Sequence, residues 1–353
     1  MRVQVIGGFL GAGKTTAIRA LARMLRERGE QVAVVTNDQG QVLVDTALCA
    51  NDDLDVTEIP GGCFCCRYDS LEQALVEAEW TGATVALAEA VGSCTDLVAT
   101  VLSPLVGRRG AKLDVAPLSV LVDGSRFEDL DGGAFSDDIK YLYEKQIEEA
   151  DVVVLTKLDQ APPDISNRIR SIRPGATIVR VSAVTGQGMS DWLAATPQAL
   201  AVPLDVDYVR YARAEAELGW ANGRVRVRAS SPLAARAIFE RFLGELTTLP
   251  VTHIKLTAID PPGGSASLVR RGGKAFFEAG RLEVARTEIV LLVNARAALP
   301  PPELEKSLRH AMAISTGEFS HEWEAFACFS PSAPVPTHRH LMRCSTYGDG
   351  CCP

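Results

Sequence analysis

The sequence predicts an α/β protein whose first part is a doubly wound, mostly parallel sheet. Over the first two-thirds of the chain, short apolar runs rich in β-branched residues alternate with helical stretches, the pattern of strands joined by crossover helices. Further on, the strands follow one another and alternate polar with apolar residues, which predicts a smaller α+β domain before a tail that contains cysteine and histidine. With 353 residues, the chain is long enough for two hydrophobic cores.

Seven candidate strands define the first domain, which we place at residues 1–205. Several are continuous apolar runs, as expected for strands that are buried on both faces of a parallel sheet. In chain order they are 2–7, 31–36, 55–59, 83–89, 118–123, 151–156 and 176–182. Helical patterns lie between them, for example over 15–28 and 70–80.

The second domain is expected over 206–329 as one antiparallel sheet with helices on one face. Its candidate strands are 223–230, 252–259, 265–271, 274–278 and 287–295, and its candidate helices are 232–246 and 302–313.

Three arginines, Arg224, Arg226 and Arg228, share one side of the first of these strands, because side chains alternate across a strand. Val225 and Val227 then face the other side, toward the core. We interpret the arginines as a solvated sheet face, and a docking patch for an acidic partner is the alternative.

The tail at 330–353 begins with three prolines in six residues, which predict an extended, semi-rigid linker. Five potential metal ligands follow, namely His338, His340, Cys344, Cys351 and Cys352. On such an arm they could capture a metal ion and pass it on, an interpretation that rests on composition. The alternative is a disordered end in which the cysteines cluster by chance.

The charge balance argues against nucleic-acid binding. Acidic residues exceed basic ones by 44 to 36, whereas phosphate contacts need a basic face. No apolar run approaches the ~20 residues that span a bilayer, and the N-terminus has no signal-peptide pattern, so we expect a cytoplasmic protein without membrane contact. In that reducing compartment nine cysteines indicate metal ligands, reactive thiols or core residues rather than disulfides.

The stretch "GFLGAGKTT" carries the phosphate-binding pattern G-x-x-x-x-G-K-T directly after an apolar strand and at the start of a helix. Its glycines let successive N–H groups turn toward phosphate oxygens, and the helix N-terminus adds positive potential. Lys14 is expected to reach the β- and γ-phosphates, and the Thr15 hydroxyl to bind Mg²⁺. A chance glycine-rich turn is the alternative, which this setting disfavours. The expected phosphate-binding residues are Gly8, Gly11, Ala12, Gly13, Lys14, Thr15 and Thr16.

The segment "VVVLTKLD" indicates which nucleotide binds. Lys157 and Asp159 match the end of the guanine-reading pattern N-K-x-D, with Thr156 in place of the asparagine. A carboxylate at Asp159 can accept both N1–H and N2–H of guanine, which adenine does not offer in that geometry. Ser182 and Ala183 stand where GTPases carry a second base-contacting loop. Together these features favour GTP over ATP.

Glu89 ends the apolar strand 83–89, three residues before Gly92. A carboxylate there can hold a Mg²⁺-bound water and sense the γ-phosphate. A surface glutamate at a strand terminus is the alternative.

These motifs, together with "GGCFCC", "EAVG", "VLVDGSRF" and "VSAVTG", occur in an order that resembles the CobW-type metallochaperone GTPases, which include nitrile-hydratase activators and zinc-transfer GTPases. The resemblance is strong over 1–195. It implies a P-loop NTPase fold, GTP hydrolysis with Lys14 and Glu89 as catalytic residues, and delivery of a metal ion to a client apo-metalloprotein. In this family a glutamate replaces the aspartate that other GTPases carry at the position of Glu89.

Two departures from the family mark a divergent subgroup. The switch-one segment reads "NDQGQ", which shortens the family's first acid to Asp38 and replaces the second by Gln41. After Gly92 the sequence "SCTDL" inserts Cys94. We interpret Cys94 as a small buried residue, with a ligand role left open.

The motif "GGCFCC" places Cys63, Cys65 and Cys66 in the loop that leaves strand 55–59, at the same sheet edge as the phosphate loop. A following helix N-terminus and Arg67 are expected to lower the pKa of the thiols. Thiolates at this spacing suit Zn²⁺ or another borderline-soft ion such as Co²⁺, Ni²⁺ or Fe²⁺, and Asp38 is a candidate oxygen ligand. A buried small-residue turn and a redox dithiol are the alternatives.

The resulting hypothesis is a GTP-driven metal insertase, in which GTP and Mg²⁺ order the switch loops and a client triggers transfer of the metal. A P-loop kinase or ATPase with redox-controlled cysteines is one alternative, and a passive metal buffer is another. Homo-oligomerisation is left open.

Overall fold

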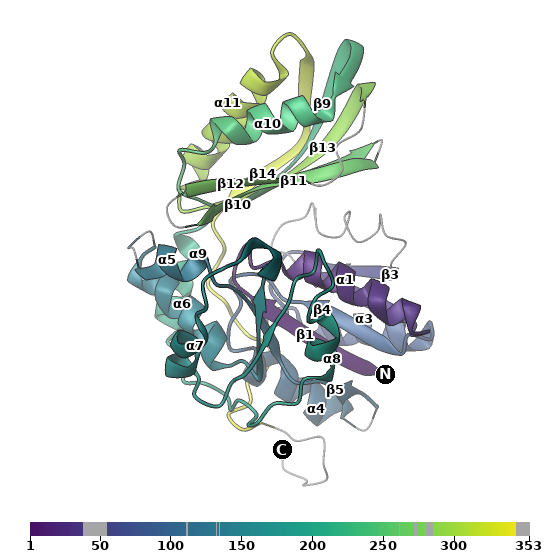
Figure 1. Ribbon diagram of the computed structural model, residues 1–353, viewed down its shortest axis with the longest axis vertical. Helices are drawn as coiled ribbons and strands as arrows, with labels where there is room; N and C mark the ends of the chain where they lie inside the picture. Colours follow the sequence, from purple (N-terminus) through teal and green to yellow (C-terminus); the bar gives the residue numbers. More distant parts are fainter. Residues whose placement is uncertain are drawn as a thin grey trace. The chain divides into compact units, whose positions relative to one another are not determined.

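The computed structural model describes residues 1–37, 55–110, 112–131, 133, 135–260, 262–271, 274–279 and 285–343. These residues form two compact units (Figure 1). The first unit contains the described residues up to 212 together with 333–343, and the second contains 213–332. Within the described ranges, no helix is both long enough and apolar enough to cross a membrane.

The first unit is built on a parallel sheet with the strand order β3-β2-β4-β1-β6-β7-β8, and the short strand β5 pairs with β1. The seven strands predicted from the sequence are all present, with ends that shift by at most two residues. The bounds are β1 (Arg2–Gly8), β2 (Val32–Asn37), β3 (Asp55–Ile59), β4 (Val85–Glu89), β5 (Asp114–Val115), β6 (Ser119–Asp123), β7 (Val152–Thr156) and β8 (Thr177–Arg180).

Helices cover both faces of this sheet (Figure 1), which is why β2, β4, β6 and β7 are buried along their whole length. The helices are α1 (Lys14–Glu27), α3 (Tyr68–Trp80), α4 (Ser103–Arg109), α5 (Arg126–Asp131), α6 (Asp137–Glu148), α7 (Ser166–Ile172) and α8 (Met189–Ala194), while α9 (Tyr208–Ala216) begins in the first unit and ends in the second. A π-helical turn at Val98–Leu102 precedes α4, and a 3₁₀ turn at Leu158–Gln160 follows β7.

Helix α1 shows why the sequence pattern was informative. Its buried apolar residues are Ala17, Ile18, Leu21, Ala22 and Leu25, the 3–4 spacing that gathers side chains on one helix face. Because all strands are parallel, the loops that follow β1, β3, β4, β7 and β8 leave the same edge of the sheet, where open α/β sheets bind ligands.

The second unit is a six-stranded antiparallel sheet with the order β12-β11-β10-β13-β9-β14, as the predicted α+β layer requires. Helices α10 (Ala235–Glu245) and α11 (Pro301–Thr316) lie side by side on one face (Figure 1) and bury an apolar core against it. The strands are β9 (Gly219–Ala234), β10 (Val251–Asp260), β11 (Pro262–Arg271), β12 (Lys274–Ala279), β13 (Ala285–Ala297) and β14 (Ser320–Phe329).

Strand β14 was not among the predicted strands, although its residues alternate in exposure as a half-buried strand does. It pairs with β9, and both edges of β9 are therefore occupied.

The predicted alternation along β9 is confirmed. Val225 and Val227 are fully buried in the core. On the opposite side the three arginines alternate with carboxylates from the flanking strands in an exposed ladder. Arg224 pairs with Glu324 at 2.6 Å, Arg226 bridges to Glu288 and Glu324, and Arg228 pairs with Glu288 at 2.7 Å.

Residues 333–343, which we call the C-terminal strap, are extended, as the prolines predict, but they lie against the first unit. Two buried carboxylates explain this position. The guanidinium of Arg339 donates to Asp96 at 2.7 Å, and both terminal nitrogens of Arg343 donate to Asp151 at 2.7 and 2.6 Å. A charge removed from water needs a paired counter-charge, and the strap supplies one to each aspartate.

The strap should therefore contribute to the stability of the first unit. Asp151 is fully buried, and only 14% of the Arg343 side chain is exposed. Arg343→Ala would leave a buried carboxylate without its cation, so we expect the free energy of unfolding to fall by about 3–5 kcal/mol. Denaturant titration with tryptophan fluorescence measures this loss.

The matched control is Arg168→Ala, which removes an exposed ion pair with Glu144. This substitution should cost less than about 1 kcal/mol. Equal losses in the two variants would contradict the role given to the strap.

Candidate functional site

The phosphate-binding loop connects β1 to α1, and its backbone requires glycine. Gly8, Gly11 and Gly13 have φ values of 131°, 77° and 90°, which side chains disfavour. An added Cβ at Gly8 would also lie 2.3 Å from the carbonyl oxygen of Leu121, far inside van der Waals contact. The loop therefore curls as the motif predicts.

Lys14 and Thr15 open helix α1 and are both buried. The Lys14 ammonium donates to the carbonyl oxygens of Gly8 and Phe9 at 2.7 and 3.3 Å, so it lies across its own loop. The Thr15 hydroxyl donates to Oε1 of Glu89, at the end of β4, over 2.9 Å. A hydroxyl beside a buried carboxylate offers two hard oxygen donors, a set that fits Mg²⁺.

The segments expected to read the base meet beside this loop. The hydroxyl of Ser182, which precedes Ala183, donates to Oδ1 of Asp159 at 2.6 Å and so joins the two predicted base-contacting segments. The Thr156 hydroxyl donates to the carbonyl oxygen of Ala12 in the phosphate loop at 2.8 Å. Thr156, at the position of the pattern's asparagine, thus ties the predicted base-reading segment to the phosphate loop.

Lys157 takes a left-handed conformation with φ of 62°, which turns its side chain back over the phosphate loop. Its Cε lies 3.8 Å from the position that a Cβ on Gly13 would occupy. Its ammonium lies 3.2 Å from the buried carboxylate of Asp123. The aliphatic stem is therefore placed as a platform above the loop, with its charge neutralised at the far end.

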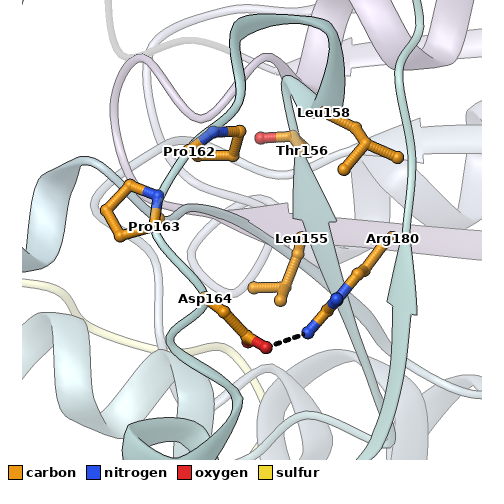
Figure 2. A pocket seen from close by; sticks show the side chains of 8 residues that line it. Leu155, Thr156, Leu158, Pro162, Pro163, Asp164 and Arg180 are labelled. Atoms are coloured by element: carbon orange, nitrogen blue, oxygen red, sulfur yellow. Dashed lines mark ion pairs between the residues drawn. The ribbon is translucent and has the colours of Figure 1, made fainter.

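A small hollow of about 50 Å³ lies on the flank of this region. Figure 2 shows its lining, with the ion pair between Asp164 and Arg180 across one side. Hydrogen bonds from Ser166 and Arg180 lower the pKa of Asp164. The hollow is too small for a nucleotide, so we interpret it as a packing gap between β7, β8 and the loop that carries Asp164.

The three cysteines of the motif form a compact sulfur cluster. Their Sγ atoms are 2.8 Å apart for Cys63 and Cys65, 3.2 Å for Cys63 and Cys66, and 3.7 Å for Cys65 and Cys66. Cys63 and Cys65 are buried and Cys66 is half-buried. Three converging thiols with little exposure are a suitable donor set for a soft or borderline ion.

The loop that carries the cluster is fixed from two sides. The side-chain amide of Asn37, at the end of β2, donates to the carbonyl oxygens of Ile59 and Gly62 at 2.9 and 2.6 Å. Gly61 has a φ of 75°, and the Arg67 guanidinium donates to its carbonyl oxygen at 3.3 Å. The turn is therefore rigid before helix α3 begins.

The expectation that all three thiols have a lowered pKa is wrong for two of them. Hydrogen bonds from Cys65 and Cys66 lower the pKa of Cys63. Hydrogen bonds with Cys63 and Cys66, together with burial, raise the pKa of Cys65. The hydrogen bond with Cys63 raises the pKa of Cys66 to about 11. Once one thiol is deprotonated, the second and third thiolates are harder to form, because each would place another negative charge beside the first in a buried site.

The C-terminal strap lies over the cluster. The backbone N–H of Val335 donates to Sγ of Cys66 at 3.3 Å, and that of Thr337 donates to the carbonyl oxygen of Cys65 at 2.8 Å. The Thr337 hydroxyl also donates to the carbonyl oxygen of Cys66 at 3.4 Å. The strap thus covers the cluster and places an N–H donor on one sulfur.

The thiol cluster and the phosphate loop share one edge of the sheet but do not follow adjacent strands. The strand order β3-β2-β4-β1 separates their strands by three spacings, roughly 14 Å at ~4.8 Å per strand. We expected the thiols and the γ-phosphate to be near neighbours. At this separation, an element that lies between the two loops has to connect them. Strand β4 and the turn after it lie between the two sites.

Several predicted ligands lie outside the described residues, namely Asp38, Cys344, Cys351 and Cys352. His338 packs edge-on against Tyr68 with ring centroids 4.9 Å apart, and its Nε2 lies 3.2 Å from a guanidinium nitrogen of Arg108. The backbone N–H of His340 donates to the carbonyl oxygen of Ala99. Over the part of the chain that can be described, neither histidine belongs to a cluster of three or more metal-ligating side chains.

A parallel sheet with a phosphate loop, a segment predicted to read the base and a cysteine cluster on one edge defines a P-loop nucleotide-binding protein with a potential metal site. The family model described as "CobW/HypB/UreG, nucleotide-binding domain" matches residues 2–180. The chain belongs to the CobW/HypB/UreG nucleotide-binding family.

Curated relatives match part of their length. The zinc chaperone CobW of Pseudomonas aeruginosa is 30% identical over 203 residues, which cover 48% of this chain and 52% of the relative. The zinc chaperone YjiA of Escherichia coli is 38% identical over 76 residues, covering 21% of this chain and 23% of YjiA. The chain thus spans about half, or less, of the relatives that it matches.

Two solved structures are similar to this chain at low TM-scores. The zinc-bound YjiA GTPase of Escherichia coli has 15% identity and a TM-score of 0.35, with 88% of this chain and 98% of that chain covered. HypB of Helicobacter pylori in complex with nickel has 19% identity and a TM-score of 0.39, with 54% and 83% covered.

Glu149, which accepts hydrogen bonds from the turn after β4, should make the free energy of unfolding depend on pH. The buried carboxylate of Glu149 accepts hydrogen bonds from the Thr95 hydroxyl and the Val98 N–H at 3.0 and 3.2 Å. Burial, with the nearby charge of Asp96, raises the pKa of Glu149 from its usual 4.5 to about 8. Between these two pKa values, the folded state holds a proton on Glu149 that the unfolded state releases. The contribution of Glu149 to the free energy of unfolding is therefore fully present below pH 4.5 and is lost as the pH rises to 8.

Glu149→Gln tests this assignment, because glutamine keeps the shape but cannot ionise. Between about pH 5 and 8, the free energy of unfolding of the unmodified protein should fall relative to that of Glu149→Gln by up to about 1.4 kcal/mol per pH unit. Denaturant titrations across that range measure the difference. Parallel pH profiles would show that Glu149 does not titrate in the folded state as stated.

Proposed function

We propose that this protein is a GTP-hydrolysing metallochaperone that holds a transition-metal ion, zinc first, on its cysteine cluster and delivers it to a client apo-metalloprotein. The observation that carries the proposal is the position of β4. Its last residue, Glu89, touches Thr15 of the nucleotide site, and its following turn lies toward the cysteine cluster. One short element can therefore report the state of the nucleotide to the metal.

The sulfur cluster supports metal as the cargo. Tetrahedral zinc with Zn–S bonds of ~2.3 Å has sulfur atoms about 3.8 Å apart. The three thiols are 2.8–3.7 Å apart, so a small outward movement would make room for the ion. Relatives named zinc chaperones support zinc as the first candidate cargo.

The nucleotide chemistry follows from the residues around the loop. Mg²⁺ on Thr15 and Glu89 would neutralise charge on the phosphates during hydrolysis. Lys14 exchanges its loop carbonyl partners for phosphate oxygens when the nucleotide binds. Asp159 accepts two guanine N–H groups, with the Ser182 hydroxyl holding the carboxylate in place.

Coupling between the two sites has a physical route. Binding of GTP and Mg²⁺ would break the direct hydrogen bond between Thr15 and Glu89, which joins α1 to β4. If that change alters the metal affinity, metal must alter the GTP affinity by the same factor, because the coupling is reciprocal. Release to a client would then be favoured in one nucleotide state.

The metal site is tested with Cys65→Ser in the full chain. Loss of one thiolate should weaken zinc binding at least about 100-fold, whereas GTP affinity without zinc should stay unchanged. Competition with a chromophoric chelator and titration with a fluorescent GTP analogue measure the two affinities. Cys328→Ser is the matched control, since it removes a half-buried thiol of the second unit. Unchanged zinc affinity in Cys65→Ser would reject the metal site.

The same preparations separate the other candidate functions. Steady-state hydrolysis of GTP and ATP is measured with and without one equivalent of zinc. A GTPase metallochaperone should prefer GTP and respond to zinc. Preference for ATP with no response to zinc or chelator would favour a kinase or ATPase, and negligible turnover would favour a metal buffer.

The base specificity is tested with Asp159→Asn. The amide can still face guanine, but it donates where guanine also donates, so GTP affinity should fall by roughly 10–100-fold, the cost of one or two charged hydrogen bonds. Xanthosine triphosphate, which carries a carbonyl group in place of the guanine amino group, should bind this variant better than GTP. If GTP affinity stays unchanged, Asp159 does not read the base.

A further inference from the structure

Cys94 adds a fourth thiol to the cysteine cluster. It lies in the turn after β4, far from the motif in sequence, and only 1% of its surface is exposed. Its thiol forms hydrogen bonds with the thiols of both Cys63 and Cys65.

The turn that carries Cys94 is held in place by helix α6. The buried side-chain amide of Gln146 donates to the carbonyl oxygens of Gly92 and Cys94 at 3.0 and 2.8 Å. The Cys94 N–H donates to the carbonyl oxygen of Val91 at 2.9 Å, and Glu149 accepts from the next residues of the turn. The backbone that carries the thiol is therefore held in place before any ion binds.

Four thiols from two separate loops are the donor set of closed, tetrahedral zinc sites. The three thiols of the motif come from one loop and cannot by themselves surround an ion. A ligand from another loop has to close the shell, and Cys94 is the thiol that already contacts two of the three. A thiolate at this position also keeps the shell soft, which favours zinc over magnesium or calcium.

We propose that Cys94 is the fourth ligand of the cargo metal, which is then held in an all-thiolate shell by Cys63, Cys65, Cys66 and Cys94. The inference rests on the proposed function, in that the metal binds at the cysteine cluster. It also identifies which ligand would respond to the nucleotide. Cys94 follows Glu89 by five residues in the same segment, so its sulfur would move with that segment. A movement of that segment with the nucleotide withdraws one ligand and opens one coordination position to a ligand of the client, with the other three thiolates still bound.

The test is zinc K-edge X-ray absorption on the full chain loaded with one equivalent of zinc. The unmodified protein should show four sulfur neighbours at about 2.3 Å and no oxygen or nitrogen neighbour. Cys94→Ser should show three sulfur neighbours and one lighter atom, with zinc affinity lowered at least about 10-fold. The matched control Cys328→Ser should keep four sulfur neighbours.

Each other outcome has a distinct meaning. Three sulfur neighbours and one light atom in the unmodified protein would overturn the role of Cys94 and favour an oxygen ligand such as Asp38, while the metal site itself remains. Four sulfur neighbours in Cys94→Ser would also overturn it, since another cysteine would then complete the shell. No bound zinc in the unmodified protein would reject the proposed function. If Cys94→Ser does not fold, Cys94→Ala loaded with zinc gives the same sulfur count, and the spectrum of the unmodified protein still distinguishes four sulfur neighbours from three.

Discussion

Strand β4 lies between β1 and β2 in a parallel sheet, and this single placement organises both candidate sites. Parallel pairing sends every strand out at the same edge, so the ends of β1, β4 and β3 all face one side. At that edge Glu89 receives the hydroxyl of Thr15, and the turn that follows reaches the thiols. The roughly 14 Å between phosphate loop and cysteine loop is thus crossed by a few residues of one segment.

That segment is unusually well fixed for a connecting turn. Gln146 and Glu149 of the α6 region hold its carbonyl and amide groups, and Tyr211 accepts a hydrogen bond from the Thr95 N–H. Asp96 of the same turn is buried and bound to Arg339 of the strap. A buried charge of this kind adds little net stability over an apolar pair, but removal of its partner is costly. The turn therefore links the nucleotide site, the thiols and the strap in one network of contacts.

The pKa values of the clustered thiols depend more on their mutual contacts than on their position before helix α3. A cysteine near a helix N-terminus is ordinarily a good thiolate, but here the thiols compete, so only Cys63 has a lowered pKa. A dication resolves this competition, because it replaces the shared protons and offsets the gathered negative charge. The burial of Cys63 and Cys65 and the strap over Cys66 mean that an ion bound there is shielded from water.

The sequence alone predicted the seven longer strands of the parallel sheet and their order along the chain. Continuous apolar runs and the 3–4 spacing of α1 specify buried strands and amphipathic helices locally, and the glycine pattern of the phosphate loop requires a backbone that only glycine adopts freely. Local rules of this kind also placed Lys14, Thr15 and the cysteine motif on the correct loops. Strand β14 was missed because its alternation of polar and apolar residues stops after Glu324, where its register against β9 shifts, and its role comes from pairing with β9. Only the tertiary structure decided that the strap folds back on Cys66, that Thr156 binds the phosphate loop, and that Cys94 meets the other thiols. These are contacts between segments far apart in the chain, and a single sequence carries no periodicity or spacing that encodes which distant side chains become neighbours.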